Sequence, residues 1–531
     1  MLLPPRWLPQ LQPICSLIPH VCALLAVIAL TACSTSDFEL GHGALRDSLP
    51  LGRGDLVEAH ETTVVAPGVT LQTIRRSSKS KPVSSWTLRS PPLLSETDFS
   101  ELKNCLTTRT SALVTFDRYA YPGQPDLTYR IINGSIFPSL EAAVSDVSYP
   151  AFKACGFKPQ DIGLTPRSDN GPWQINVLEI DPSLFAGRIA VKLANDVLAG
   201  LEPVQAIAER ARAIAAVNAS FFVMHEADGI VGDVAGLTVV GGRIISEPLN
   251  GRAILVLANK PKVSGRIADM NAEVRLLLPD GTKLVVDGIN RMPGLTRNCG
   301  NAGDVPTSMA VHDATCSDSG EIIILESMAG FALDSSLPFR VFVNYLGLVS
   351  AAIPEDWAAQ GGFVIAATGD RASELAHVLT PGTSTRILNE FGDGGTDVFA
   401  VNGAPLLLRG SENIDRAHIE GWPLDLGTSS ARADEIHRWI NLRAPRTAVG
   451  IRGDGRLLLV TIDGRQKKVS VGATISELRS VMRALGAEDA LNLDGGGSST
   501  MIVNGRIVNS PSDPSGPRPV ADAIILYDDA N

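Results

Sequence analysis

Three adjacent glycines, Gly495, Gly496 and Gly497, separate two apolar runs in the stretch ALNLDGGGSSTMIVNG. Short apolar runs bounded by turn residues are typical of buried strands, so the glycines fall where one strand ends and another begins. Glycine loses more conformational entropy on folding than any other residue, and a simple corner would need only one. Successive glycine N–H groups can surround a ligand oxygen, because no Cβ intervenes. We therefore expect a tight, ligand-facing loop with hydroxyl donors from Ser498 and Ser499; a sharp strand-to-strand corner is the alternative.

Apolar runs with strand character recur along the chain, and only a few helices separate them. Strands are expected at WQINVLEI, RAILVLAN, EIIILES and GGFVIAATG, and RTAVGIRGDGRLLLVTIDGR predicts a hairpin with a GDG turn. Helical spacing of apolar residues occurs in LEPVQAIAERARAIAAVN, DRASELAHVL and TISELRSVMRALG. This pattern predicts an α+β fold, in which a mixed sheet is covered by a few packed helices.

The length of 531 residues predicts about two to four domains. We expect a signal peptide over 1–33, a linker over 34–60, the first strands of the main domain over 61–93, an inserted module over 94–165 and the rest of the main domain over 166–531. The inserted module is predicted to be a small α/β unit, from the strand pattern of DLTYRIINGSIF and the helical spacing in SLEAAVSDVSYPAFKACGF. Its element lengths resemble the repeat of peptidoglycan-associated SPOR domains.

The N-terminal residues have the pattern of an export signal, with an apolar core, ALLAVIAL, followed by LTAC. That ending resembles a bacterial lipobox, which implies cleavage before Cys33 and acylation of its thiol. The protein would then be attached to a membrane by lipid and not by a spanning helix. Ser34 in the next position implies the outer membrane or the periplasmic face of the envelope. An ordinary secretory signal that contains a cysteine is the alternative.

Cysteine usage also favours export. Of seven cysteines, two precede the proposed cleavage site and Cys33 would carry lipid, which leaves Cys105, Cys155, Cys299 and Cys316. An even remainder outside the cytoplasm predicts two disulfides. Proximity in sequence favours Cys105 with Cys155 and Cys299 with Cys316. A zinc site is a minor alternative, because no CxxC spacing is present.

Charge and motif searches exclude several classes of function. The net charge of −11 and the lack of a Lys/Arg cluster argue against nucleic acid as a partner. The eight histidines form no HxH or HExxH motif, which argues against a metallophosphodiesterase, and GGGSST does not match a serine-hydrolase elbow. No cofactor and no metal site are expected, although EFGDGGTD leaves a calcium or magnesium ion open.

Six motifs carry a family resemblance: VNASFF, GLTVVGGRIIS, INRMPG, PRTAVGIRGDGRLLLVTIDGR, ALNLDGGGSSTMIVNG and NSPSDPSGPRPVADAIIL. In their order and spacing, the chain resembles the phosphodiester glycosidase family from about Trp173 to Asn531, together with the strand near Val64. Ser220 departs from the family, which often has glycine in the first motif. Asp522 is replaceable within the family, so no catalytic role is expected for it.

The resemblance implies hydrolysis of the bond between a sugar's anomeric carbon and a phosphate. Glycosidic cleavage normally uses two carboxyl groups. Asp494 and Asp463 are the candidates, since each ends an apolar run and precedes a glycine, as expected at the mouth of a sheet. A phosphate leaves with less proton assistance than an alcohol, so a single carboxylate could suffice. Asp463 could instead accept N–H bonds that shape a turn.

Four further residues complete the expected substrate site. Arg446 and Arg518 lie within the motifs, and a planar guanidinium suits phosphate oxygens; a surface ion pair is the alternative for each. Asn218 and Asn492 could bind a sugar hydroxyl or pin a loop. We expect an exported, lipid-anchored hydrolase that cleaves a sugar-1-phosphodiester in a glycoconjugate or envelope polymer.

Two alternatives remain open at this point. One is a non-catalytic envelope lipoprotein that binds exopolysaccharide or peptidoglycan. The other is a glycosidase that acts on ordinary glycosides and would depend little on the two arginines. Sugar identity, stereochemistry, metal dependence and oligomeric state do not follow from the sequence.

Overall fold

The computed structural model divides the chain into two units, residues 1–47 and 48–531. All described residues lie in the second unit: 48–52, 54–78, 85–90, 96–111, 114–121, 124–156, 165–167, 170–226, 229–249, 251–269, 273–297, 305–310, 314–391, 395, 397–414, 416, 420, 439–440 and 442–528. No helix in these ranges is both long and apolar enough to cross a membrane.

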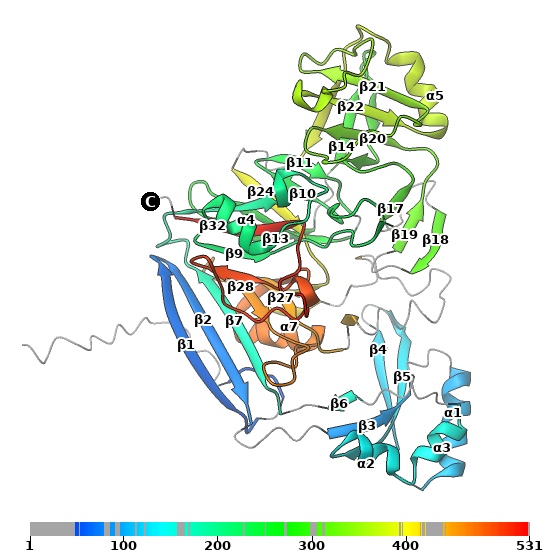
Figure 1. Ribbon diagram of the computed structural model, residues 1–531, viewed down its shortest axis with the longest axis vertical. Coiled ribbons are helices and arrows are strands. Elements are labelled where there is room, and N and C mark those ends of the chain that lie inside the picture. The colour runs from blue at the N-terminus through cyan, green and yellow to red at the C-terminus, as the bar shows by residue number, and fades with distance from the viewer. Residues whose placement is uncertain are drawn as a thin grey trace, which may run out of the picture. The chain divides into compact units, whose positions relative to one another are not determined.

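The largest sheet has eight strands and connects segments from the whole of the second unit. Its order is β1 (Val57–Ala66), β2 (Val69–Ser77), β7 (Trp173–Ile180), β28 (Leu457–Ile462), β27 (Arg446–Arg452), β29 (Ala487–Asn492), β25 (Leu406–Arg409) and β26 (Glu412–Asn413). Every neighbouring pair is antiparallel. Figure 1 shows β1, β2 and β7 as long adjacent arrows, so the chain before the inserted segment pairs with the chain after it.

The two faces of this sheet pack into different cores, as the alternation of side chains along a strand requires. On β28, Leu458 and Val460 join a core that also contains residues of helix α7 (Ile475–Ala484). Leu457 and Leu459 point to the opposite face and join a second core. All six residues of β28 are therefore buried, which explains its continuous apolar sequence.

A five-stranded sheet contributes to the second core. Its order is β31 (Arg506–Ile507), β30 (Met501–Val503), β9 (Ala215–Asn218), β32 (Asp522–Tyr527) and β8 (Arg188–Leu193), again with antiparallel neighbours throughout. Val217 and Ile524 pack in the same cluster as Leu457 and Leu459. Both of these sheets therefore contribute to this core, and the chain passes from one to the other between β29 and β30.

Four smaller sheets complete the part that follows residue 237. The first has the strand order β11 (Arg243–Ser246), β10 (Thr238–Val240), β24 (Val398–Asn402), β12 (Ala253–Ala258) and β13 (Ser264–Asp269). The second consists of β15 (Lys283–Val285), β14 (Glu273–Leu277) and β23 (Arg386–Glu390), and the third of β16 (Gly288–Ile289), β20 (Ile322–Glu326), β22 (Gly362–Ala367) and β21 (Phe339–Asn344). The fourth consists of β17 (Leu295–Arg297), β19 (Ala314–Ser317) and β18 (Val305–Ala310). Among the described residues outside the inserted segment, the helices are α4 (Val204–Ala211), α5 (Gly369–Val378) and α7, with 3-10 turns η1 (Ala194–Asp196), η3 (Trp357–Ala359) and η4 (Gly496–Ser498).

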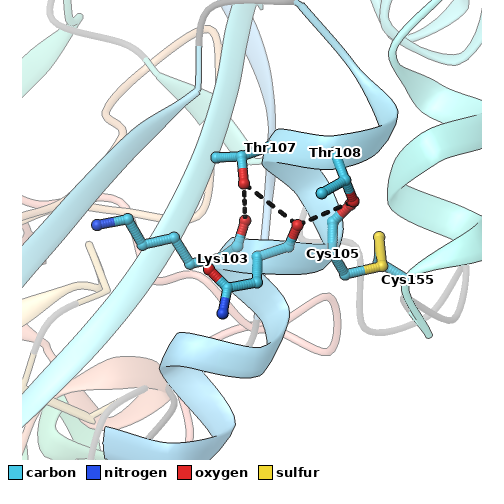
Figure 2. Close-up of a disulfide and its surroundings, with 6 residues drawn as sticks. Lys103, Cys105, Thr107, Thr108 and Cys155 are labelled. Carbon is cyan, nitrogen blue, oxygen red and sulfur yellow. Dashed lines mark hydrogen bonds between the residues drawn. A yellow bond between two sulfur atoms is a disulfide. The ribbon is translucent and has the colours of Figure 1, made fainter.

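The inserted segment, residues 85–167, has a sheet and a core of its own, and it begins before the expected module of 94–165 because the strand Ser85–Arg89 belongs to its sheet. Its strands are β4 (Thr115–Tyr121), β5 (Gln124–Phe137), β3 (Ser85–Arg89) and β6 (Thr165–Arg167), and its helices are α1 (Glu96–Arg109), α2 (Leu140–Ser145) and α3 (Tyr149–Ala154). Phe99, Leu106 and Phe152 are buried in this separate core. The predicted Cys105–Cys155 disulfide is confirmed and links α1 to the end of α3 (Figure 2). Cys299 and Cys33 lie outside the described residues, as does the side chain of Cys316.

The predicted α+β fold on a mixed sheet is wrong. Within the described ranges strands greatly outnumber helices, and every strand pairing is antiparallel except the short contact of β16 with β20. The local predictions at the hairpin and helices are confirmed: β27 pairs with β28, and α4, α5 and α7 form where helical spacing occurs. The error arose because an apolar run indicates burial but carries no information on the direction of the neighbouring strand.

Candidate functional site

The triple-glycine loop spans residues 493–500. It connects β29 of the eight-stranded sheet to β30 of the five-stranded sheet that also contains β9 and β32. Antiparallel pairing brings the end of β29, the start of β27 and the end of β28 to the same edge of the large sheet. This places Asn492, Arg446 and Asp463 together at that edge. β30 pairs with β9, so Asn218, at the end of β9, also lies beside the loop.

Most backbone N–H groups of the loop have an acceptor, but two do not. The N–H of Asp494 donates to Ala219 O at 2.9 Å, and that of Gly496 donates to Pro445 O at 2.9 Å. Two further bonds, from Ser498 to Gly495 at 3.1 Å and from Ser499 to Gly496 at 3.4 Å, close the 3-10 turn. The N–H groups of Gly495 and Gly497 have no acceptor among the described residues. The expected cradle is therefore limited to these two donors.

Each glycine of the triplet makes room for a different neighbour. A Cβ on Gly495 would lie 2.9 Å from Pro445 O. Gly496 has φ of +60°, and a Cβ there would also lie 3.2 Å from the Arg465 guanidinium. A Cβ on Gly497 would lie 2.3 Å from both Arg518 Nη2 and Asp513 Oδ2. The triplet is therefore required by three separate close approaches, to a carbonyl, a guanidinium and an ion pair.

Asn218 pins the loop through its side chain. Its Nδ2 donates to Asp494 O at 2.7 Å, and its Oδ1 accepts from Thr447 Oγ1 at 3.0 Å and from Thr500 N at 3.1 Å. Thr447 Oγ1 also lies 3.1 Å from Ser499 Oγ. These polar groups are buried and mutually satisfied, so Asn218 and Ser499 support the loop from beneath.

Asn492 and Ser498 are also buried, and each retains one unpaired oxygen. Asn492 Nδ2 donates to Ala404 O at 2.7 Å and to Leu493 O at 2.9 Å. Asn492 Oδ1 and Ser498 Oγ have no hydrogen-bond partner among the described residues. Neither oxygen is accessible from solvent, so the structure gives these two side chains no direct route to a ligand.

Asp463 is fully buried directly after β28, and four N–H contacts reach its carboxylate. Oδ1 accepts from Asn509 Nδ2 at 3.0 Å, Oδ2 accepts from Gln174 Nε2 at 3.0 Å, and Ser510 N lies 2.9 Å from both oxygens. Burial raises the pKa of Asp463 to about 6, and the bonds from Ser510 and Asn509 act in the opposite direction. This arrangement fixes the chain around residues 509–510, which continues toward Asp513.

Asp494, by contrast, is half-buried on the loop itself, where its backbone is held by Asn218 and Ala219. The predicted pair of aspartates thus lies at one edge, with Asp463 fully buried and Asp494 half-buried.

The two predicted arginines are both occupied by neighbours. Arg446 is buried; its Nε donates to Ala473 O at 2.8 Å and its Nη2 donates to Trp439 O at 2.7 Å. Burial lowers the pKa of Arg446 to about 9, and the charge of Arg465 adds to this shift. Arg518 pairs with Asp513, with Nε 2.9 Å and Nη2 2.8 Å from Oδ2.

Two residues of the site were missed in the sequence. Arg465 lies over Gly496, and Asp513 lies against Gly497. Both belong to motifs of the family resemblance, within the stretches TIDGR and SPSDPSGPR, so the sequence contains a signal for them. The sequence does not show that the turns with Arg465 and Asp513 both approach the triple-glycine loop.

Asp522 forms a second buried carboxylate beside the site. Its Oδ1 accepts from Ser220 N at 2.8 Å and its Oδ2 accepts from Ser220 Oγ at 2.7 Å. Burial raises the pKa of Asp522 to about 6, against the effect of these bonds. Ser220 therefore uses its hydroxyl to anchor the segment that follows Asn218.

A cavity of about 360 Å³ lies on residues 229–236, 247–249 and 291–294. Its polar lining includes Glu247 and Arg291, which are 2.8 Å apart, and Arg291 also pairs with Glu321. These charges neutralise one another in part. Residues 291–294, which line one side of the cavity, belong to the INRMPG motif.

No group of three His, Cys, Asp or Glu side chains in the described ranges is placed to share a metal ion.

Comparison with known proteins bears on this site. The family model of phosphodiester glycosidases matches residues 347–527, which confirms the resemblance for the segment that contains the loop. The SPbeta prophage-derived uncharacterized protein YomE of Bacillus subtilis (strain 168) is 39% identical over 87 residues, 16% of this chain and 13% of that protein. The N-acetylglucosamine-1-phosphodiester alpha-N-acetylglucosaminidase of Mus musculus is 37% identical over 76 residues, 14% of each chain. The chain thus matches about one seventh of the length of these relatives.

One solved structure is similar over nearly the whole chain. It is a protein of Burkholderia pseudomallei K96243 whose name suggests export and states no activity. The similarity has a TM-score of 0.71 with 28% identity, and it covers 92% of this chain and 99% of that chain. The same overall architecture therefore occurs in that Burkholderia protein.

Proposed function

We propose that this chain, whose residues 347–527 match the phosphodiester glycosidase family, is a hydrolase that cleaves the bond between a sugar's anomeric carbon and a phosphodiester oxygen. Water adds to the anomeric carbon, the carbon–oxygen bond breaks, and the phosphate departs as a monoester. The products are a free sugar and a phosphorylated alcohol. N-acetylglucosamine is the first sugar to test, because the mouse relative is named for its 1-phosphodiester.

The observation that carries this proposal is the half-buried Asp494 on a loop whose backbone is held by hydrogen bonds and is flanked by arginines. Asn218 and Pro445 hold the loop, and Arg465 and Arg518 lie against its glycines. In a glycosidase, a fixed carboxylate stabilises the positive charge that develops at the anomeric carbon or activates water. We assign that work to Asp494.

The two other predicted polar groups take supporting roles in this proposal. Asp463 holds residues 509–510 and thereby the chain that carries Asp513. Arg446 binds backbone carbonyls around Trp439 and Ala473, and it adds positive charge beneath the loop. Both act through neighbouring residues, so we describe them as positioning residues.

Export and envelope attachment remain part of the proposal. The apolar N-terminal run that ends at Cys33 supports export with lipid attachment, and the name of the Burkholderia relative suggests export for that protein. A substrate in a glycoconjugate or envelope polymer would be accessible from that location.

The test is sugar release from a panel of α- and β-sugar-1-phosphodiesters, with Asp494→Asn beside the wild type. Asp454→Asn is the matched control, because it removes an exposed carboxylate at the β27–β28 turn, the opposite end of the same strands. We expect turnover by the wild type and the control, and a loss of at least about 100-fold in Asp494→Asn. Normal melting of all three proteins, with no sugar released from any substrate, would contradict the proposal.

A further inference from the structure

Arg465 occupies a position that the family resemblance alone did not single out. It follows Gly464 after β28, and its backbone has φ of +60°, a region that residues other than glycine rarely adopt. Its side chain is exposed, and the Nη2 and Nη1 atoms lie 3.2 and 3.4 Å from where a Cβ on Gly496 would be. Strained residues of this kind are frequent at functional sites, because the surrounding structure must stabilise them.

The guanidinium of Arg465 differs from its two neighbours in having no partner among the residues that the structure describes. Arg446 donates to carbonyl oxygens, and Arg518 pairs with Asp513. No hydrogen bond or ion pair joins Arg465 to any other residue in the described part of the chain. It therefore presents all the donors of its planar group beside the loop.

The loop itself supplies two more donors. Gly495 and Gly497 have N–H groups without an acceptor among the described residues, and Gly497 is buried. Buried backbone N–H groups in native proteins are almost always paired, so an acceptor from outside the chain is expected here. Backbone N–H groups beside a guanidinium favour an anion with several oxygens.

The local charge favours the same class of ligand. Arg446 lies under the loop as a buried cation that interacts electrostatically with Arg465. Glu477, whose negative charge also acts on Arg446, already forms an ion pair with Arg443. An oxyanion bound at Arg465 would reduce the repulsion between two like charges.

We propose that Arg465, together with the N–H groups of Gly495 and Gly497, binds the phosphate of the substrate. This inference rests on the proposed function, and it moves the phosphate contact away from Arg446 and Arg518. As the bond to the anomeric carbon breaks, negative charge grows on the departing phosphate oxygen. The fixed donors of Arg465 stabilise that charge, so its effect is greatest on the chemical step.

The test combines a binding measurement with a rate measurement on the same variants. Binding of inorganic phosphate is measured by calorimetry, and kcat/KM is measured with a sugar-1-phosphodiester. The variants are Arg465→Gln and Arg465→Lys, with Lys468→Gln as the control that removes an exposed positive charge from the same turn. Melting temperatures establish that each variant is folded.

We expect Arg465→Gln to weaken phosphate binding by at least about tenfold and to lower kcat/KM by about 100-fold. Arg465→Lys should have a phosphate affinity and a kcat/KM between those of the wild type and Arg465→Gln, because an ammonium keeps the charge but lacks the planar arrangement of donors. Lys468→Gln should match the wild type. Equal phosphate binding by wild type and Arg465→Gln, including no binding by either, overturns the inference.

The two measurements also separate this inference from the proposed function. If the wild type hydrolyses the substrate and Arg465→Gln does so at the same rate, the inference fails and the proposed function is retained. If the wild type hydrolyses no substrate but binds phosphate only through Arg465, the anion site is confirmed and the proposed function fails.

Discussion

Asn218 Nδ2 donates a 2.7 Å hydrogen bond to the backbone carbonyl of Asp494, which lies 276 residues further along the chain. The bond joins the end of β9 to the start of the triple-glycine loop. Two motifs that are far apart in sequence thus form one rigid support. The position of the Asp494 carboxylate depends on both.

Asn218→Ala should reduce both stability and activity. The substitution removes three hydrogen bonds, to Asp494 O, Thr447 Oγ1 and Thr500 N, and leaves their groups buried. We expect a loss of about 3 kcal/mol in the free energy of unfolding, measured by chemical denaturation. Asn413→Ala is the control, because Asn413 is exposed on β26 and contacts Arg483. A loss for Asn218→Ala no larger than for this control would contradict the prediction.

Gly497→Ala should displace the ion pair beside the loop. The new methyl group would lie 2.3 Å from both Arg518 Nη2 and Asp513 Oδ2, so one of them must move. We expect about 1 to 3 kcal/mol of destabilisation and at least about a tenfold loss of kcat/KM. Gly54→Ala has no atom within 4 Å of the added methyl and should change stability by less than about 0.5 kcal/mol. Similar kinetics for both variants would show that the close approach is unimportant.

Asp463→Asn tests whether this aspartate positions the site or reacts. An amide group would turn two donors toward Gln174 Nε2 or Ser510 N, which are donors themselves. We expect a loss of about 2 to 3 kcal/mol in stability, with kcat of the folded protein reduced only a few fold. Thermal melts and active-site-normalised kinetics distinguish the roles. Unchanged melting with a complete loss of turnover would indicate direct participation in the reaction.

Asp522 should make stability depend on pH in a defined direction. Its pKa of about 6 in the folded protein lies above the ordinary value of 3.8. The folded state therefore favours the protonated carboxyl, and this contribution is complete below about pH 4 and is lost as pH rises through 6. The loss amounts to about 3 kcal/mol by pH 8.

The measurement is the difference in unfolding free energy between wild type and Asp522→Asn from pH 3 to pH 8. Asparagine keeps an oxygen to accept from Ser220 N and does not ionise. The variant should gain stability relative to wild type as pH rises. A constant difference across the range would show that burial of Asp522 does not shift its ionisation.

Loss of the Cys105–Cys155 disulfide should affect the inserted segment and not the triple-glycine loop. The bridge spans 50 residues and should contribute about 4 kcal/mol by restricting the unfolded chain. Because the segment has its own core, Cys105→Ser with Cys155→Ser should lower the protection of α1 in hydrogen exchange. Kinetics on a small phosphodiester should stay unchanged. A parallel loss of turnover would show that the segment supports the site.

Local structure was predictable where one segment contains all the necessary information. The GDG turn between two apolar runs determined the β27–β28 hairpin. Thr474 and Glu477 form a reciprocal capping box at the start of α7, where apolar residues follow at helical spacing. Strand direction was not predictable, since β29 and β7 reach their partners through long-range pairing. The predicted mixed sheet failed for this reason.

The sequence by itself determined that a glycine-rich loop with Asp494 would follow a buried strand, because three adjacent glycines are costly unless close approaches require them. Only the tertiary structure decided which neighbours approach: Pro445, Arg465 and the Asp513–Arg518 pair. It also decided that Asp463 is fully buried while Asp494 is half-buried. Exposure and partner choice depend on how sheets pack across the chain, and a residue's type and its immediate neighbours do not contain that information.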